Sequence, residues 1–198
     1  MHESQRRQEE WETRYRAGLT AWDRGAVSPA IEHWLASGHL MPCRILAPAC
    51  GHGHEVLVFA RRGFSVTAVD IAPSALKALD WGLSQAGLSA EVVQADLLQW
   101  TPAQPFEAVY EQTALCALVP DTWADYAARL RTWLKPGGRL YALFMQTGQP
   151  GGPPFHCDLD EMRRLFPDTD WIWPNTVPLE VPHPTGLHEL GVVLTSRG

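Results

Sequence analysis

The sequence predicts an α/β fold: a single doubly wound, mostly parallel sheet of seven strands, with an N-terminal helical lid and a C-terminal antiparallel hairpin. Short apolar runs alternate with stretches that carry apolar residues at helical spacing, which is typical of strands covered by helices. The first run leads into a glycine turn and the next three end in acidic residues, as strands do where such sheets bind ligands. We expect one domain, 1–198, with the lid in 1–40, a ligand-binding core in 44–145, and a loop and the hairpin in 146–198.

Five segments are predicted as buried strands, because each is four to seven residues long and rich in apolar side chains. These strands are 44–48, 65–70, 90–96, 106–111 and 138–144. Three helices are predicted between them, where apolar residues recur every three to four positions. These helices are 54–62, 72–86 and 121–134.

The two ends of the chain differ in character from this core. Near the N-terminus, Trp11, Tyr15 and Leu19 recur every four positions and predict one apolar face on a charged helix. Near the C-terminus, a short helix at 158–165 precedes two extended runs, 171–181 and 188–196. A Pro-Thr-Gly turn joins these two runs and predicts an antiparallel hairpin. The prolines in the first run predict that it lies at the edge of the sheet.

Composition narrows the class of protein. With 198 residues, 45% hydrophobic and 19% charged, the chain suits one globular domain. A net charge of −6 and basic runs no longer than two residues argue against nucleic acid. We expect a cytoplasmic protein that meets no membrane, because the chain has no apolar stretch of spanning length and its N-terminus is charged. A monomer is also expected. Its four scattered cysteines are expected to be free thiols.

The first strand runs into a glycine turn, Gly51-His52-Gly53. Glycine lets the backbone turn sharply and approach a ligand without a Cβ in the way. The next strand ends in Asp70, nineteen residues after Gly51, where nucleotide-binding folds place the carboxylate that accepts from ribose hydroxyls. Val56 stands where a dinucleotide fingerprint requires its third glycine. The pattern therefore favours a ribose-bearing ligand without phosphates, of which S-adenosylmethionine is the common one.

Two further acids end the third and fourth predicted strands, Asp96 and Glu111. Because the carboxyl ends of parallel strands border one crevice, we expect both acids beside the same ligand. Asp96 is suited to accept from an adenine amino group. Taken singly, each acid is equally well explained as a helix cap or a solvated loop carboxylate.

Five motifs occur in the order found in the thiopurine methyltransferase superfamily. They are Trp22-Asp23-Arg24-Gly25, Pro48-x-Cys50-Gly51-x-Gly53, Val69-Asp70-Ile71-x-x-Ser74-Ala75-Leu76, Cys116-Ala117-Leu118 and Gly151-Gly152-Pro153-Pro154-Phe155. Over residues 8–165 the chain most resembles the thiol, thiocyanate and halide methyltransferases of that superfamily. Residues 134–140 also resemble the turn before the fifth strand of class I methyltransferases.

The resemblance implies an S-adenosylmethionine-dependent methyltransferase that acts on a small nucleophile such as a thiol, thiopurine, thiocyanate or halide, with S-adenosylhomocysteine as product. The residues implied around the donor are Trp11, Trp22, Gly51, Gly53, Asp70, Ile71, Asp96, Leu97 and Glu111. The chain departs from the family pattern at two places. It has Glu55 where the family often has an aspartate, and Glu111-Gln112 where plant members have Asp-Tyr.

Methyl transfer from a sulfonium to an anion needs mainly a dry pocket that aligns the reacting atoms. Candidate pocket residues are Trp22, Leu115, Phe144, Phe155, His156 and Asp158. No catalytic residue follows firmly from the sequence. If a neutral thiol must lose its proton, His156, Asp158 or Glu111 is placed to assist.

Competing interpretations remain open. An NAD-dependent oxidoreductase shares the fold and the ribose acid, and a protein that binds the donor without catalysis would keep the glycine turn. Cys50, His52 and His54 are good metal ligands, but alternate residues of a tight turn rarely converge on one ion, so no metal is expected. Core positions are expected for five of the nine tryptophans, Trp34, Trp81, Trp100, Trp123 and Trp133.

Overall fold

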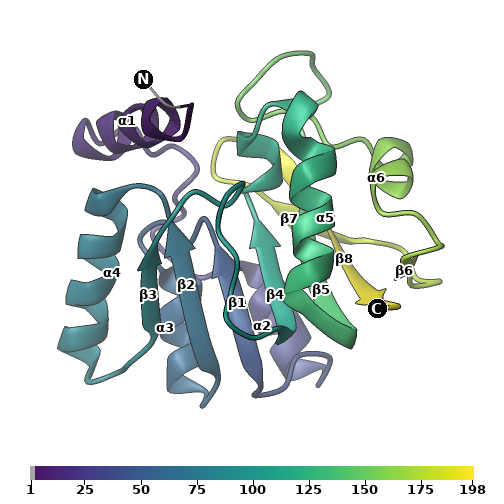
Figure 1. Ribbon diagram of the computed structural model, residues 1–198, viewed down its shortest axis with the longest axis horizontal. Helices are drawn as coiled ribbons and strands as arrows, with labels where there is room; N and C mark the ends of the chain where they lie inside the picture. Colours follow the sequence, from purple (N-terminus) through teal and green to yellow (C-terminus); the bar gives the residue numbers. More distant parts are fainter. Residues whose placement is uncertain (1–2) are drawn as a thin grey trace. The chain divides into compact units, whose positions relative to one another are not determined.

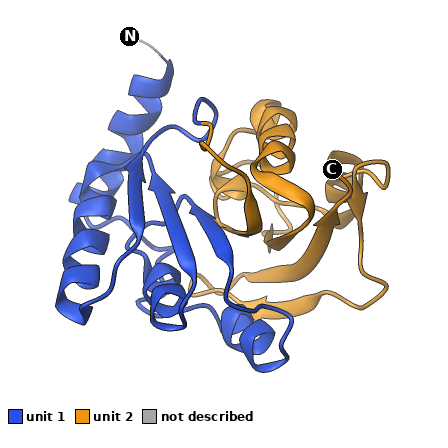
Figure 2. Ribbon diagram, turned by 60° about the horizontal axis from the view of Figure 1, so that its bottom comes forward, with its two compact units in different colours: residues 1–100 blue, residues 101–198 orange. Residues whose placement is uncertain are grey.

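The computed structural model describes residues 3–198. The chain forms two compact units, Met1–Trp100 and Thr101–Gly198, which are coloured separately in Figure 2. Within residues 3–198, no helix has both the length and the apolar character needed to cross a membrane. The four cysteines form no disulfide in this part of the chain.

Unit 1 contains three parallel strands in the order β3-β2-β1. They are β1 (Arg44–Pro48), β2 (Ser65–Asp70) and β3 (Glu91–Gln94). The predicted bounds of β1 and β2 are confirmed to the residue, and β3 is shorter than predicted. Four of five residues in β1 and five of six in β2 are buried, as expected for strands covered on both faces.

Two helices cover these strands, α3 (His54–Arg61) and α4 (Pro73–Ala86). Helix α3 packs on β2, and α4 packs on β2, β3 and α3. The buried face of α4 carries Leu76, Leu79 and Leu83, spaced three and four residues apart. Trp81 lies off this face and is 68% exposed, so its predicted core position is wrong.

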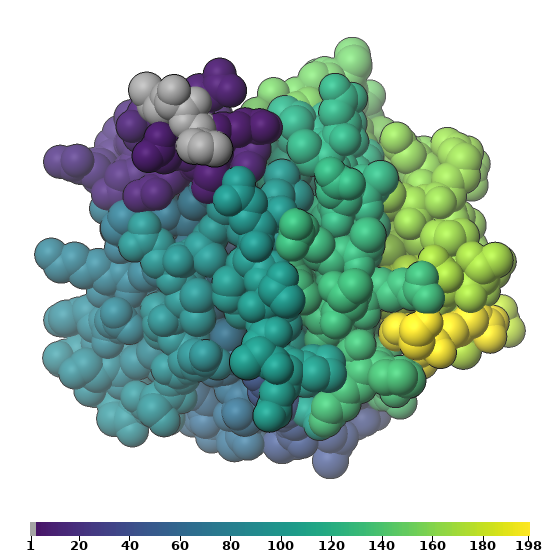
Figure 3. Space-filling model, viewed as in Figure 1, coloured from purple at the N-terminus to yellow at the C-terminus, as the bar shows by residue number. Residues whose placement is uncertain are grey.

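Two helices precede β1, namely α1 (Glu3–Arg16) and α2 (Pro29–Ala36). Helix α1 has no fully buried residue, lies on the surface (Figure 3) and sits beyond the carboxyl ends of β2 and β3 (Figure 1). It ends before Gly18, whose φ is +67°, so Leu19 does not share the face of Trp11 and Tyr15 as predicted and is 65% exposed. Helix α2 was not predicted, although Ser28 caps it and Pro29 opens it.

Unit 2 is built on β4 (Phe106–Gln112) and β5 (Leu134–Gln146), which run parallel. Strand β8 (His188–Ser196) pairs antiparallel with β5 from Arg139↔Thr195 to Gln146↔His188. Helix α5 (Trp123–Trp133) packs on β4 and β5, and α6 (Leu159–Leu165) contacts α5. Two short 3-10 helices, η1 (Leu115–Ala117) and η2 (Pro120–Thr122), precede α5.

The predicted hairpin is present, but its first run forms two short strands. Strands β6 (Trp171–Ile172) and β7 (Leu179–Pro182) each pair antiparallel with β8. Pro174 and Pro178 lie between them, and proline cannot donate to a strand ladder. The described chain therefore has eight strands where seven were predicted, because the edge run is interrupted.

Candidate active site

The glycine turn joins β1 to α3 and is tightly packed. Gly51 and Gly53 have φ values of +54° and +78°, a region that side chains other than glycine rarely adopt. A Cβ on Gly53 would lie 2.3 Å from Leu79 Cδ1, and one on Gly51 would lie 3.0 Å from the Tyr15 hydroxyl. Glycine is therefore required here for both conformation and space.

Asp70 ends β2 directly beside this turn. One carboxylate oxygen accepts from the Gly51 N–H at 2.9 Å and the other from the Ala72 N–H at 2.9 Å. The residue is 5% exposed, and this burial raises the pKa of its carboxyl above the ordinary value despite the backbone N–H bonds. Each oxygen retains a lone pair, so the carboxylate can still accept from two ribose hydroxyls. Ile71 stands between Asp70 and Ala72.

Asp96 is engaged by the N-terminal helix. Arg7 donates two hydrogen bonds to one carboxylate oxygen, at 3.2 Å from Nε and 2.7 Å from Nη2, and the Leu98 N–H donates to the other at 3.0 Å. Burial opposes ionisation, yet these bonds hold the pKa of Asp96 below its ordinary value. Leu97 beside it is 8% exposed. An adenine amino group would have to share this carboxylate with Arg7.

An aromatic cluster leads from α1 to the glycine turn. Trp22 packs edge-on against Trp11 at 5.5 Å and against Tyr15 at 5.7 Å between ring centroids. Tyr15 in turn packs against the ring of His52 at 5.3 Å. Burial is the main cause that raises the pKa of the Tyr15 hydroxyl, so it stays protonated. Trp22 and Trp11, both predicted donor contacts, are thus linked to the turn through Tyr15.

Further polar contacts fasten the N-terminal segment, the residues before β1, to the rest of unit 1. The Glu12 carboxylate accepts from the Ser74 N–H at 2.9 Å and from its hydroxyl at 2.6 Å, at the start of α4. Glu55 accepts from the Ser28 N–H at 2.9 Å. The negative side chain of Glu12 at a helix N-terminus is also favoured by the helix dipole.

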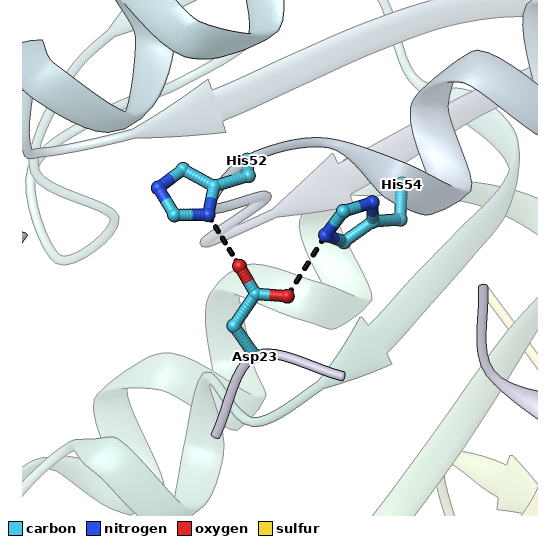
Figure 4. Close-up of side chains that lie close together, drawn as sticks. All are labelled: Asp23, His52 and His54. Atoms are coloured by element: carbon cyan, nitrogen blue, oxygen red, sulfur yellow. Dashed lines mark hydrogen bonds and ion pairs between the residues drawn. The ribbon is translucent and has the colours of Figure 1, made fainter. Parts of the chain in front are cut away.

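A third connection joins Asp23 to two histidines of the turn region (Figure 4). His52 Nδ1 and His54 Nε2 each bond a different oxygen of the Asp23 carboxylate, the latter at 2.8 Å. Asp23 also accepts from the Gly25 N–H at 2.7 Å. The histidines therefore converge, which the sequence argument did not expect, but on Asp23 and without Cys50.

In unit 2, Glu111 ends the buried part of β4. It is 1% exposed and accepts from the Leu115 N–H at 2.7 Å, at the start of η1. Burial, reinforced by the charge of Glu189, raises the pKa of Glu111 to about 7. The group therefore titrates near neutral pH, in contrast to an ordinary glutamate.

The other predicted pocket residues of unit 2 have structural partners. Phe144 is 1% exposed and packs between Phe166 and Trp173, at 5.9 and 6.2 Å. The Phe155 N–H donates to the Cys116 carbonyl at 2.7 Å and ties its loop to η1. Asp158 caps α6 by accepting from two backbone N–H groups of its first turn.

His156 is held by the loop that follows β5. Its Nδ1 accepts from the Thr147 N–H at 3.1 Å and from the Gly148 N–H at 3.4 Å. A backbone N–H can only donate, so Nδ1 is an acceptor and the neutral ring carries its proton on Nε2. In this tautomer neither nitrogen is available to take a further proton without breaking these bonds.

Sequence reasoning missed the roles of Arg7, Glu12, Tyr15 and Asp23. A signal for Arg7 was present, because it precedes Trp11 and Tyr15 by four-residue steps and shares their helix face. Asp23 lies within the Trp22-Asp23-Arg24-Gly25 motif but had no partner assigned. Its histidine partners lie 29 and 31 residues away, beyond the reach of a local pattern.

Comparison with known proteins identifies the family. The model of the thiopurine S-methyltransferase family matches residues 6–172. The chain belongs to this family. It is 31% identical over 159 residues to probable thiol methyltransferase 2 of Arabidopsis thaliana, covering 79% of this chain and 70% of that protein. It is 33% identical over 148 residues to thiocyanate methyltransferase 1 of Brassica oleracea, covering 73% and 66%.

A solved structure supports the fold. The 1,6-didemethyltoxoflavin-N1-methyltransferase of Burkholderia thailandensis, solved with S-adenosylhomocysteine, aligns with a TM-score of 0.77 at 21% identity and covers 96% of this chain and 87% of its own. The class I methyltransferase fold predicted from the sequence is confirmed. As a member of the thiopurine S-methyltransferase family, the chain is an S-adenosylmethionine-dependent methyltransferase of small molecules.

Proposed function

We propose that this enzyme methylates a small sulfur nucleophile that arrives as an anion, either a thiolate or thiocyanate. The observation that carries this proposal is that all three groups considered as proton acceptors have structural partners. Glu111 is 1% exposed and accepts from the Leu115 N–H at 2.7 Å. His156 Nδ1 already accepts from two backbone N–H groups, and Asp158 caps α6. An acceptor that is ionised in water needs no base, and the names of the thiol and thiocyanate methyltransferases that the chain resembles agree with this class.

The donor-binding residues that we propose lie mostly in unit 1. S-adenosylmethionine, when bound, supplies an electrophilic methyl group. Asp70 is suited to it because both carboxylate oxygens retain acceptor capacity beside the glycine turn. The remaining proposed contacts are Trp11, Trp22, Gly51, Gly53, Ile71, Asp96, Leu97 and Glu111.

The N-terminal segment is proposed to act as a lid that keeps water from the donor. Its contacts with the glycine turn, with Ser74 and with Asp96 support this role, because a water-free site strengthens the attraction between sulfonium and anion. The acceptor side is proposed to include Trp22, Phe144, Phe155 and their surroundings. We also propose one domain, because the family match spans residues of both units, acting as a cytoplasmic monomer that binds no nucleic acid.

The deciding experiment is a methyl-transfer assay with a panel of acceptors. Hydrosulfide, a small organic thiol, thiocyanate, iodide and a thiopurine are each supplied with S-adenosylmethionine, and S-adenosylhomocysteine is quantified. We expect turnover with the thiols or thiocyanate to exceed turnover with the bulky thiopurine. Preference for the thiopurine would overturn the acceptor proposal, and the absence of turnover with all five would favour a protein that binds the donor without catalysis.

S-adenosylhomocysteine is expected to raise the melting temperature of the protein, because a ligand selective for the native state stabilises it by mass action. At a concentration of 100 times the dissociation constant the gain is about 2.7 kcal/mol. NAD serves as the matched control, since it also carries adenine and ribose. A shift with NAD and none with S-adenosylhomocysteine would contradict the donor assignment.

Trp22→Ala is expected to lower turnover more than stability, because the indole is partly exposed and packs edge-on against Trp11 and Tyr15. Trp133→Ala is the matched control. Trp133 is 1% exposed in the core of unit 2, so its truncation is expected to cost about 3–5 kcal/mol of unfolding free energy. Urea unfolding and turnover per folded molecule separate the two effects. Equal stability losses with turnover intact would make Trp22 a structural anchor.

A further inference from the structure

Asp23, His52 and His54 form a cluster of metal-ligating side chains that methyl transfer does not use. Asp23 lies between α1 and α2, His52 lies in the glycine turn, and His54 is the first residue of α3. Figure 4 shows both imidazole rings directed at the one carboxylate. One ligand atom from each residue lies within 4.8 Å of the other two.

The chemistry of these three groups suits a transition metal. Imidazole nitrogen and carboxylate oxygen are ligands that zinc, nickel and copper share, whereas magnesium and calcium prefer oxygen alone. Two histidines, one carboxylate and a water molecule make up a recurring zinc coordination set. In the absence of an ion, each histidine donates a ring N–H to the carboxylate, which can only accept. An ion would replace these two hydrogen bonds with three coordinate bonds.

The cluster is both accessible and held in place. The side chains are 32%, 30% and 17% exposed for His52, His54 and Asp23, so an ion and its water ligands can reach them from solvent. The Gly25 N–H orients the Asp23 carboxylate, and the Tyr15 ring packs against His52. Such supporting contacts orient metal ligands in known sites.

We propose that Asp23, His52 and His54 bind one divalent transition-metal ion of the zinc class, with water completing the coordination. The ion would link the segment before α2 to the glycine turn, because Asp23 belongs to that segment, His52 lies in the turn and His54 follows it. This inference is independent of the acceptor and of catalysis. It revises the expectation from the sequence, in which Cys50 was considered as a partner and Asp23 was not.

The test uses the full chain without a histidine tag, freed of metal by a chelator that is then removed. Zinc binding is measured by calorimetry, and cobalt is used as a spectroscopic probe. The variants are Asp23→Asn, His52→Asn and His54→Asn, which keep hydrogen-bonding groups while weakening coordination. His39→Asn is the matched control, because His39 is an exposed histidine of unit 1 that bonds the Ser37 hydroxyl.

We expect one zinc ion per chain, a higher melting temperature with zinc, and no comparable binding of magnesium. Each ligand variant should lower zinc affinity by at least about tenfold, and His39→Asn should leave it unchanged. Cobalt should give visible absorption without the intense near-ultraviolet band of a cobalt–thiolate bond. His52→Asn, which changes a partly exposed side chain, provides the test if Asp23→Asn does not fold.

Absence of saturable zinc binding to the unaltered chain would overturn the proposal. Binding that persists in all three ligand variants would overturn it as well, and a cobalt–thiolate band would move the site to Cys50. If Asp23→Asn and His52→Asn lower the melting temperature while the unaltered chain binds no zinc, the cluster only fastens the N-terminal segment.

Discussion

Asp70→Ala is expected to lower the affinity for S-adenosylhomocysteine by about 10- to 150-fold, which corresponds to about 1.5–3 kcal/mol. The carboxylate is the acceptor that we propose for the ribose hydroxyls, and alanine offers none. The same substitution removes the acceptor of the Gly51 and Ala72 N–H groups. We therefore also expect a lower melting temperature, because a backbone donor left unpaired in the interior is costly.

The two effects of Asp70→Ala are separated by measuring the dissociation constant calorimetrically at a temperature where the variant is fully folded. Asp80→Ala is the matched control, because Asp80 is an exposed acid on α4. Asp80→Ala should change neither the dissociation constant for S-adenosylhomocysteine nor the melting temperature. A dissociation constant that stays the same in the Asp70 variant, with only its stability reduced, would leave Asp70 a purely structural residue.

Glu111→Gln is expected to remove a pH dependence of stability worth about 3 kcal/mol. Burial raises the pKa of Glu111 to about 7 in the folded chain, from an ordinary value of 4.5. Each pKa unit corresponds to about 1.4 kcal/mol of difference between the two protonation states. Glutamine has the shape of the protonated acid and cannot ionise, so it mimics the form that the interior prefers.

The direction of this effect follows from proton binding. Between pH 4.5 and about 7 the folded chain keeps the proton on Glu111, whereas the unfolded chain has released it. The native state then binds more protons, so its free energy of unfolding falls as the pH rises through this window. Above about pH 7 Glu111 is ionised in both the folded and the unfolded chain, and its contribution to the free energy of unfolding no longer changes with pH.

Urea unfolding of the unaltered chain and of Glu111→Gln at several pH values from 4.5 to 8 measures the difference. The stability of Glu111→Gln relative to the unaltered chain should grow across this range. Glu107→Gln is the control from the same strand, since that side chain is 42% exposed and pairs with Lys135. Two stability curves that run parallel from pH 4.5 to 8 would show that Glu111 does not titrate in this window.

The strands and central helices were predictable because they depend on local periodicity. Strands β1 and β2 have the predicted bounds, and each end of α3 and α4 lies within one residue of its predicted position. Errors occurred where a second local rule overrode the apolar pattern. Gly18 ended α1 before Leu19 joined its apolar face, and prolines divided the edge run into β6 and β7. Trp81 was misplaced because hydrophobicity alone does not say which helix face is buried.

The sequence by itself determined the order of the central strands and of the helices between them, the glycine turn and the acid at the end of β2. Each of these depends on residues close together in the chain, since a backbone with positive φ requires glycine and a strand requires a short apolar run. The family motifs predicted S-adenosylmethionine as the methyl donor, and the family match supported this prediction.

Only the tertiary structure decided which side chains meet. Arg7 reaches Asp96 across 89 positions, and Asp23 reaches His52 and His54 across 29 and 31. No local pattern encodes such contacts, because they depend on how α1 and the segment after it fold back over the ends of the strands. Burial is also a property of the folded chain, so the raised pKa of Glu111 could not be inferred from its place in the sequence.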